Sequence, residues 1–324
     1  MYKSVDLLKM VNDTLDTMQY LRQPSSLYEP IQYVLSLGGK RIRPVLMMMS
    51  YNLFKERPEE IMNQAIALET YHNYTLLHDD LMDQADLRRG HTTVHKKWDA
   101  NKAILSGDSM LVLSYERMAK CAENYLPAVL HLFTETALEI GEGQEYDMAF
   151  ETRNDVTEEE YIEMIRLKTS VLLACAMKIG AIMGDASEKD QNYLYEYGEK
   201  LGLAFQLQDD LLDVYGDPKV FGKAIGGDIM CNKKTYMLIN AFNRANAEQR
   251  TELERWIGME HPVREEKVAA VTALYNSMGI RELCEQKIAY YTGLANESLA
   301  KVSVPDERKE LLRQYALELM CRQK

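Results

Sequence analysis

The hydrophobic positions of this chain recur mostly at the three- and four-residue intervals of amphipathic helices. The strict alternation of a half-buried strand, bounded by turn residues, is hard to find. The pattern therefore predicts an all-α fold. Helices are expected over residues 4–20, 26–37, 42–54, 59–84, 100–122, 126–148, 157–183, 188–214, 233–245, 248–257, 262–275, 279–300 and 305–322.

Turn and capping residues agree with these limits. Thr157 and Glu160 have the spacing of a capping box, and Gly184 follows the end of the same helix. No Gly/Ser-rich linker or abrupt change of composition divides the chain. We expect one domain over residues 1–324, with a smaller C-terminal helical lobe over 246–324 as an alternative.

The least helical internal stretch runs from Tyr215 to Asn232 and contains four glycines. We expect it to form a long mobile loop. Lys219 and Lys223 lie within this stretch and give the loop a reason to bind an anion.

Composition and charge narrow the classes of function. Hydrophobic residues make up 46% and charged residues 27% of the chain, which is ordinary for a globular protein and argues against disorder beyond the termini. The net charge of −12 argues against a nucleic-acid partner. The five cysteines are far apart and are expected to be reduced thiols. No stretch approaches the roughly 18 apolar residues of a membrane span, and a cytoplasmic location is expected.

An acidic heptapeptide that occurs twice carries the most chemical information. Residues 77–83 have the sequence LHDDLMD, and residues 207–213 have the sequence LQDDLLD. Three carboxylates within five residues repel one another and resist burial. A fold that collects two such clusters is therefore expected to neutralise them with cations.

Helix geometry sharpens this expectation, since positions seven apart nearly eclipse. His72, Asp79 and Asp83 then share one face, and Asp80 lies beside them. Mg²⁺ takes oxygen ligands and usually keeps waters and substrate phosphates among them. If the second helix faces the first, the two clusters can hold a diphosphate through several bridging ions. A single cluster of this kind is usually a solvated helix face, and the second copy weakens that interpretation.

Three basic segments complement the acidic ones. Residues 38–44 (GGKRIRP) place two glycines before three cations, and Arg43 can bind a phosphate bidentately. Arg88 and Arg89 follow the first acidic cluster, either as a surface salt-bridge patch or as part of a diphosphate site. Lys168 precedes an apolar segment and either extends to solvent or faces a cavity where its charge needs an anionic ligand.

The histidines offer two alternative metal sites, and neither fits the sequence well. His91 and His95 have the spacing of a zinc pair, but no glutamate follows the first and no clear third ligand is near. His78 followed by Asp79 suggests an HD-type phosphohydrolase. However, His78 and His72 lie about 240° apart around a helix, and the second acidic cluster would have no role.

Taken together, these motifs resemble the short-chain, farnesyl and geranylgeranyl diphosphate synthase-like members of the trans-type polyprenyl diphosphate synthases. The resemblance runs from about Gly38 to Lys234 and rests on GGKRxRP, DDxxD followed by RRG, KT, FQxxDDxxD, GK and KKT. It implies the isoprenoid synthase fold, a single large helical bundle around a deep apolar cavity with both acidic clusters at its mouth.

The resemblance also implies an activity. Such enzymes condense isopentenyl diphosphate with an allylic diphosphate (dimethylallyl, geranyl or farnesyl) by Mg²⁺-assisted ionisation and condensation. It further implies about three Mg²⁺ ions per active site and a homodimer.

Carried over position by position, the resemblance implies the following roles. Mg²⁺ would be held by Asp79, Asp80, Asp83, Asp209, Asp210 and Asp213. Isopentenyl diphosphate would be bound by Gly39, Lys40, Arg43, His72 and Arg89. The allylic diphosphate would contact Arg88, Lys168, Lys223 and Lys233. The catalytic residues would be Lys168, Thr169 and Gln206. Thr169 and Gln206 would stabilise the carbocation that forms when the allylic diphosphate ionises. Gln144 and Asp147 resemble a further element near the metals.

Product length is expected to depend on the residues beneath the first acidic cluster. Thr75 and Tyr71 lie one and two helical turns below Asp79, with Leu68 a turn deeper. Tyr74 occupies a position where the resembled family often places an aromatic that limits length. These features suggest a C15 or a C20 product, between which the sequence does not choose.

Two alternatives to chain elongation are weaker. A terpene cyclase of the same fold would have little need for the phosphate pocket of Gly39, Lys40, Arg43 and Arg89. A non-catalytic subunit of a heteromeric synthase commonly loses one acidic cluster, whereas this chain has both.

Overall fold

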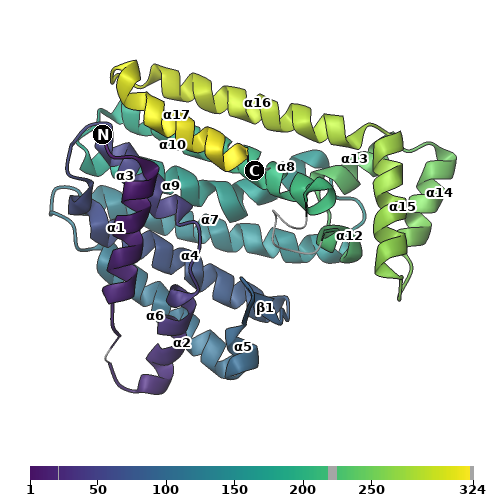
Figure 1. The fold of residues 1–324 in the computed structure, drawn as a ribbon, viewed down its shortest axis with the longest axis horizontal. Helices are drawn as coiled ribbons and strands as arrows, with labels where there is room; N and C mark the ends of the chain where they lie inside the picture. Colours follow the sequence, from purple (N-terminus) through teal and green to yellow (C-terminus); the bar gives the residue numbers. More distant parts are fainter. Residues whose placement is uncertain (21, 218–224, 322–324) are drawn as a thin grey trace. The chain divides into compact units, whose positions relative to one another are not determined.

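The computed structural model describes residues 1–20, 22–217 and 225–321. Its described residues are mostly helical, and their only strands are β1 (Leu87–Arg88) and β2 (His91–Thr92), which form one antiparallel hairpin (Figure 1). This architecture confirms the expected all-α fold. The chain forms two compact units, which are described separately.

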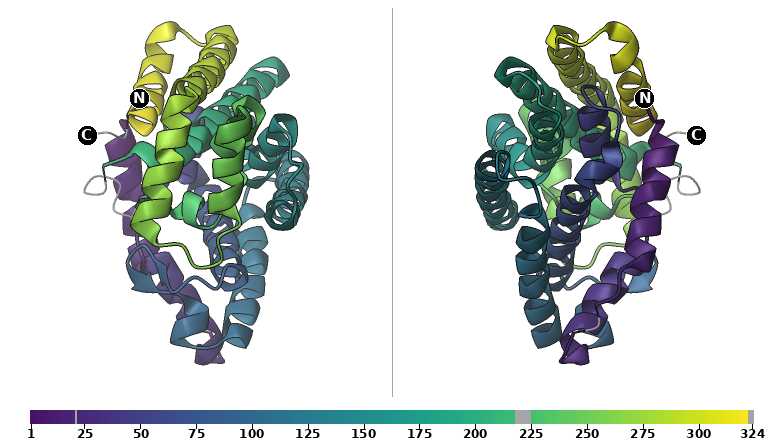
Figure 2. Two further views of the ribbon diagram at one scale, coloured as in Figure 1. Left: turned by 90° about the vertical axis from the view of Figure 1, so that its right-hand side faces the viewer. Right: turned by 90° about the vertical axis from the view of Figure 1, so that its left-hand side faces the viewer.

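The first unit contains residues 1–134, 176–192 and 303–312. Its complete elements, besides the hairpin, are α1 (Ser4–Thr17), α2 (Ser25–Ser36), α3 (Ile42–Asn52), η1 (Pro58–Ile61), α4 (Met62–Met82), α5 (Val94–Lys97) and α6 (Ala100–Met118). It also includes the start of α7 (Leu126–Thr152), the end of α9 (Val171–Met183) and the starts of α10 (Glu188–Tyr215) and α17 (Asp306–Met320). Helix α4 packs against α6 and also contacts α3. Figure 2 shows the ribbon of the chain from two further sides.

Helix α3 lies at the centre of the first unit. Residues 45–49 are all fully buried, because this helix is apolar around nearly its whole circumference. The polar Ser50 is accommodated by donating its hydroxyl hydrogen to the carbonyl oxygen of Met177, at 2.6 Å. A buried α3 fixes the position of the basic segment that precedes it.

The second unit contains residues 135–175, 193–302 and 313–324, as far as these are described. Its complete elements are α8 (Glu158–Ile165), the π-helical turn η2 (Arg166–Ser170), α12 (Gly227–Met230), α13 (Tyr236–Arg244), α14 (Ala247–Ile257), α15 (Arg264–Ser277) and α16 (Ile280–Lys301). The remaining parts of α7, α9, α10 and α17 complete it. Its core includes Phe150, Tyr161, Leu207, Leu211 and Trp256.

Two segments differ from the expectation. The predicted helix over residues 157–183 consists of α8, η2 and α9, because a π-helical turn interrupts the α-helical spacing. The predicted loop over residues 215–232 includes the short helix α12, which begins after Gly226 in the left-handed conformation, with φ of 79°. Lys219 and Lys223 lie outside the described residues.

The helix cap, the cysteines and the lengths of the helices can also be compared with the sequence. The capping box of Thr157 and Glu160 is present at the start of α8. All five cysteines are free of disulfides. Among the helices of the described residues, none has the length and apolar character required to cross a membrane. The single domain over residues 1–324 stays a prediction.

Candidate active site

The basic segment before α3 adopts backbone conformations that favour glycine. Gly38 and Gly39 have φ of 75° and 135°, and Arg41 has φ of 48°. A Cβ atom on Gly39 would lie 2.9 Å from the guanidinium carbon of Arg89. The glycine therefore lets the backbone approach Arg89, which donates from Nη1 to the carbonyl oxygen of Gly38.

A buried ion pair holds this segment in place. The Nη1 atom of Arg41 lies 2.7 Å from Oε1 of Glu69 on α4, and their side chains are only 3% and 2% exposed. Arg41 also donates to the carbonyl oxygen of Leu35 at 2.9 Å, and Asn73 donates to the same glutamate oxygen at 3.0 Å. These bonds compensate the desolvation of both charges. They join α4 to the segment that carries Lys40 and Arg43.

Arg43 and His72 form the second contact between these two elements. The guanidinium Nη1 lies 3.1 Å from Nε2 of His72. Burial and the charge of Arg43 lower the pKa of His72 well below its usual value, so its neutral ring accepts this hydrogen bond. Burial lowers the pKa of Arg43 to about 10, and the group stays cationic at neutral pH. Its buried Nε has no hydrogen-bond partner among the described residues, which suits a site for an anion.

The first acidic cluster lies at the end of α4 against the hairpin. Arg88 on β1 donates from Nε to Oδ1 of Asp80 at 2.8 Å, and its Nη2 lies 3.5 Å from Oδ2 of Asp79. Burial raises the pKa of Asp80, although Arg88 opposes the shift. Arg89 and Gly90 have φ of 53° and 78° and form the tight turn of the hairpin. This turn sets the direction of the Arg88 and Arg89 side chains. The structure thus brings Arg88 to the first cluster, whereas Arg89 bonds to Gly38.

An aromatic cluster lies on α4 before the acidic residues. The rings of Tyr71 and Tyr74 are 5.4 Å apart between centroids, and Tyr71 packs against Phe133 of α7 at 5.2 Å. Tyr74 also packs edge-on against His78 at 4.9 Å. Leu68 and Tyr71 are buried, whereas Tyr74 and Thr75 are half-buried. The four predicted length-determining residues therefore include two that belong to a continuous aromatic contact.

The second acidic cluster lies on α10 in the second unit. Asp210 is buried and accepts hydrogen bonds from the Tyr161 hydroxyl and, at 2.9 Å, from Nε2 of Gln206. Thr169 donates to Oε1 of the same glutamine at 3.2 Å. Burial and the neighbouring charge of Asp228 raise the pKa of Asp210 to about 7. The predicted catalytic pair, Thr169 and Gln206, is therefore linked directly to this cluster.

Two of the predicted cations lie beside a further carboxylate. The Nζ atom of Lys168 is 2.6 Å from Oδ2 of Asp147, and Nζ of Lys233 is 3.8 Å from the same oxygen. Although burial opposes ionisation, Lys233 and Lys168 lower the pKa of Asp147 below its usual value. Asp147 therefore holds both cations at one place in the second unit. Lys223 falls outside the described residues.

The sequence interpretation missed Asp228. Its backbone N–H donates to Oδ2 of Asp213 at 2.9 Å. Burial raises the pKa of Asp228 to about 6; Lys233 opposes this shift, and Asp213 and Asp209 add to it. The only sequence signal was a lone aspartate after two glycines and shortly before Lys233, which is too short to be distinctive.

The described carboxylates lie beside cations rather than in a group that could hold a metal ion alone. Within residues 1–20, 22–217 and 225–321, no three His, Cys, Asp or Glu side chains are placed to hold a metal ion alone, and His91 and His95 gain no third ligand. Mg²⁺ typically uses one or two carboxylates and takes its other oxygens from phosphates and water. The pairing of aspartates with Arg88, Lys168 and Lys233 suits a phosphate ligand of this kind.

Comparison with known proteins decides the family. Residues 24–276 match the model of the polyprenyl synthetase family. The chain belongs to the polyprenyl synthetase family. This confirms the resemblance drawn from the motifs, and it makes the chain a prenyltransferase of the Mg²⁺-dependent prenyl synthases.

Individual relatives agree with this assignment. A geranylgeranyl diphosphate synthase of Methanosarcina mazei is 42% identical over 237 residues, which are 72% of this chain and 73% of that protein. A solved geranylgeranyl pyrophosphate synthase is 42% identical, with a TM-score of 0.95 and complete coverage of both chains. A geranylgeranyl pyrophosphate synthase of Corynebacterium glutamicum, solved with isoprenyl diphosphate and magnesium, is 28% identical, with a TM-score of 0.85 and coverage of 98% and 97%.

The polyprenyl synthetase fold of this chain is expected to depend on the buried Arg41–Glu69 pair. Glu69→Met leaves an uncompensated guanidinium in the core and should lower the free energy of unfolding by about 3–5 kcal/mol. The double variant Arg41→Met with Glu69→Met removes both charges and should recover much of this loss. Urea denaturation followed by circular dichroism measures both.

The exposed pair of Arg250 and Glu254 provides the matched control, since its side chains are 56% and 58% exposed. Glu254→Met should cost no more than about 1 kcal/mol. Equal losses for Glu69→Met and Glu254→Met would contradict the importance of the buried pair.

Proposed function

We propose that this prenyltransferase makes a C20 product, geranylgeranyl diphosphate, by adding isopentenyl diphosphate to an allylic diphosphate. The observation that carries the proposal is the chain-long similarity to a solved geranylgeranyl pyrophosphate synthase. The C15 alternative has no comparable support. The expected cytoplasmic location stays a prediction.

The basic residues of the first unit are proposed to bind isopentenyl diphosphate. Arg43 is fixed by His72, and its free Nε gives it a further donor for a phosphate oxygen. Gly39 and Lys40 of the basic segment, and Arg89 of the hairpin turn that lies against Gly39, would supply backbone and cationic donors. Since His72 is neutral, it adds no charge and acts by holding the guanidinium in place.

The two acidic clusters are proposed to act on the allylic diphosphate. When bound, about three Mg²⁺ ions would neutralise the charge that develops on the leaving diphosphate. The proposed ligands are Asp79, Asp80, Asp83, Asp209, Asp210 and Asp213. Arg88, Lys168 and Lys233, together with Lys223, would donate hydrogen bonds to the same group as the carbon–oxygen bond breaks.

Thr169 and Gln206 are proposed to steady the allylic cation. Their side-chain oxygens are joined by a hydrogen bond of 3.2 Å and present partial negative charge without a nucleophilic carboxylate. The double bond of isopentenyl diphosphate attacks the cation, and the proton that is then lost can pass to the released diphosphate. This chemistry needs the exclusion of water more than it needs a protein base.

The purified protein should incorporate labelled isopentenyl diphosphate into a C20 product when it is given Mg²⁺ and an allylic diphosphate. Asp79→Ala and Asp209→Ala should each lower kcat by about two to three orders of magnitude, as expected for a group that stabilises transition-state charge. Product chromatography and steady-state kinetics with each allylic starter measure these effects.

Asp13→Ala serves as the control, since Asp13 lies on α1 in an exposed pair with Lys9. It should leave the rate unchanged. Absence of incorporation with every starter would refute the proposed activity. Near-normal rates for either cluster variant would refute its metal-binding role.

The aromatic contact on α4 is proposed to set product length. Tyr71→Ala and Tyr74→Ala each remove a ring from the cluster that includes Phe133, and both should shift the products beyond C20. Chromatography of dephosphorylated products measures the shift. Tyr290→Ala is the control, because Tyr290 is 57% exposed on α16. An unchanged product distribution in both α4 variants would exclude these rings as the length determinant.

A homodimer is also proposed, and helix α6 supports it. Leu105 and Val112 are 53% and 68% exposed, and their spacing of one heptad places them on one face. Val112→Arg should therefore shift the protein from dimer to monomer in light scattering coupled to gel filtration. Val263→Arg, at a residue that is 55% exposed before α15, is the control. A monomeric wild-type protein would refute the proposal.

A further inference from the structure

The π-helical turn η2 carries two of the proposed catalytic residues. It spans Arg166–Ser170 and includes Lys168 and Thr169. A π-helical turn contains more residues than an α-helical turn and is rare unless its surroundings hold it. If it relaxed to an α-helical turn, the side chains on it would rotate about the helix axis. The position of Lys168 and Thr169 therefore depends on whatever stabilises this turn.

Close backbone packing holds the turn between two helices of the second unit. A Cβ atom on Gly143 of α7 would lie 2.3 Å from the backbone nitrogen of Lys168. A Cβ atom on Gly202 of α10 would lie 2.6 Å from Cα of Ser170. The Ser170 hydroxyl also donates to the carbonyl oxygen of Ile165, at 3.3 Å. Only glycine allows these approaches, so the turn is fixed at both faces.

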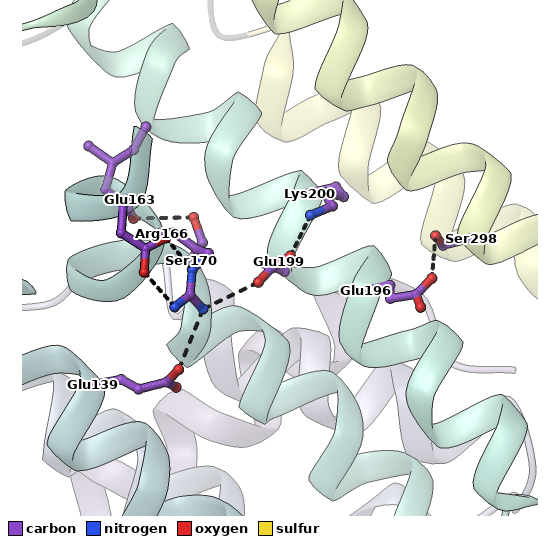
Figure 3. A network of polar contacts seen from close by, with 9 residues as sticks. Glu139, Glu163, Arg166, Ser170, Glu196, Glu199, Lys200 and Ser298 are labelled. Atoms are coloured by element: carbon purple, nitrogen blue, oxygen red, sulfur yellow. Dashed lines mark hydrogen bonds and ion pairs between the residues drawn. The ribbon is translucent and has the colours of Figure 1, made fainter. Parts of the chain in front are cut away.

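Arg166 ties the beginning of the turn to three helices, as Figure 3 shows. Its guanidinium donates to both carboxylate oxygens of Glu163 on α8, each at 2.8 Å. The Nη1 atom lies 3.4 Å from Glu139 of α7 and 3.4 Å from Glu199 of α10. The arginine is 25% exposed, so solvent screens these pairs only in part. A fixed planar fork with several donors suits this bridging role.

Two other residues of the turn, Lys168 and Thr169, contact residues of the candidate site. Lys168 bonds to Asp147, and Thr169 bonds to Gln206, which in turn bonds to Asp210. Arg166 thus bonds to Glu163, Glu139 and Glu199, whereas Lys168 bonds to Asp147 and Thr169 bonds to Gln206. The rigid π-helical turn is what connects these two sets of contacts.

We propose that Arg166 is a positioning residue, which acts through the π-helical turn to hold Lys168 and Thr169 in their reactive places. The inference rests on the proposed prenyl-transfer function. The bonds of Arg166 go to Glu163, Glu139 and Glu199. Its removal lets the turn relax, which misplaces the Lys168 ammonium group and the Thr169 hydroxyl.

Kinetics of Arg166→Met in the full-length enzyme test this role. We expect kcat to fall about 10- to 100-fold, the size of effect that a misplacement of about 1 Å produces. The KM for isopentenyl diphosphate should stay near the wild-type value, because its proposed site lies on other elements. Arg166→Lys keeps the charge but loses the planar fork, and should recover part of the rate.

A mutant cycle separates positioning from a general loss of structure. In a background that carries both Lys168→Met and Thr169→Val, Arg166→Met should cost less than 3-fold in kcat, since both groups that it positions are already absent. Additive costs would overturn the proposal. Wild-type kinetics in folded Arg166→Met would also overturn it. An inactive wild-type protein would instead overturn the proposed function.

Two controls use neighbouring positions. Gly143→Ala should reproduce the fall in kcat, whereas Gly141→Ala should not, because a Cβ atom on Gly141 meets nothing within 4 Å. Glu196→Gln disturbs the 3.1 Å hydrogen bond to Ser298 from the same helix as Glu199 and should leave kcat unchanged (Figure 3). Circular dichroism confirms folding of every variant. Equal effects of Gly141→Ala and Gly143→Ala would count against the packing argument.

Discussion

A carboxylate that is taken out of water costs several kcal/mol unless a cation or a hydrogen-bond donor accompanies it, and both units of this protein are organised around such carboxylates. Asp80 is paired with Arg88, and Glu69 is paired with Arg41. Asp210 accepts hydrogen bonds from Tyr161 and Gln206. Within each unit, these bonds fix the cations and donors that we propose to contact a metal–diphosphate complex. The same pairs that make burial tolerable therefore hold the proposed site residues in place.

Unusual backbone geometry is the second constraint, and it occurs where charge must be aimed. Gly38 and Gly39 let the basic segment pass against Arg89, and the turn after Arg88 points its guanidinium back at the acidic cluster. In the second unit, the π-helical turn directs Lys168 to Asp147 and Thr169 to Gln206. Regular α-helices supply the framework, while these irregular segments decide where the reactive groups point.

These features explain how helices alone support prenyl transfer. The reaction needs a charged region that accepts diphosphate and an apolar region that tolerates a carbocation. Asp79 and Asp80 on α4 are proposed to supply the first, and Tyr71 and Leu68 are buried on the same helix. A single helix thus carries both environments, because polar residues gather at its end and apolar residues precede them.

The sequence by itself determined the helical fold, both acidic clusters and the basic motifs, because helical spacing and DDxxD are local patterns that need no partner. Only the tertiary structure decided which charges meet. The pairing of Arg41 with Glu69, of Lys168 with Asp147 and of Asp228 with Asp213 joins residues 15 to 28 positions apart, which no local spacing connects. The π-helical turn was also hidden, since packing against Gly143 and Gly202 stabilises it. Long-range packing, rather than local propensity, fixes such contacts.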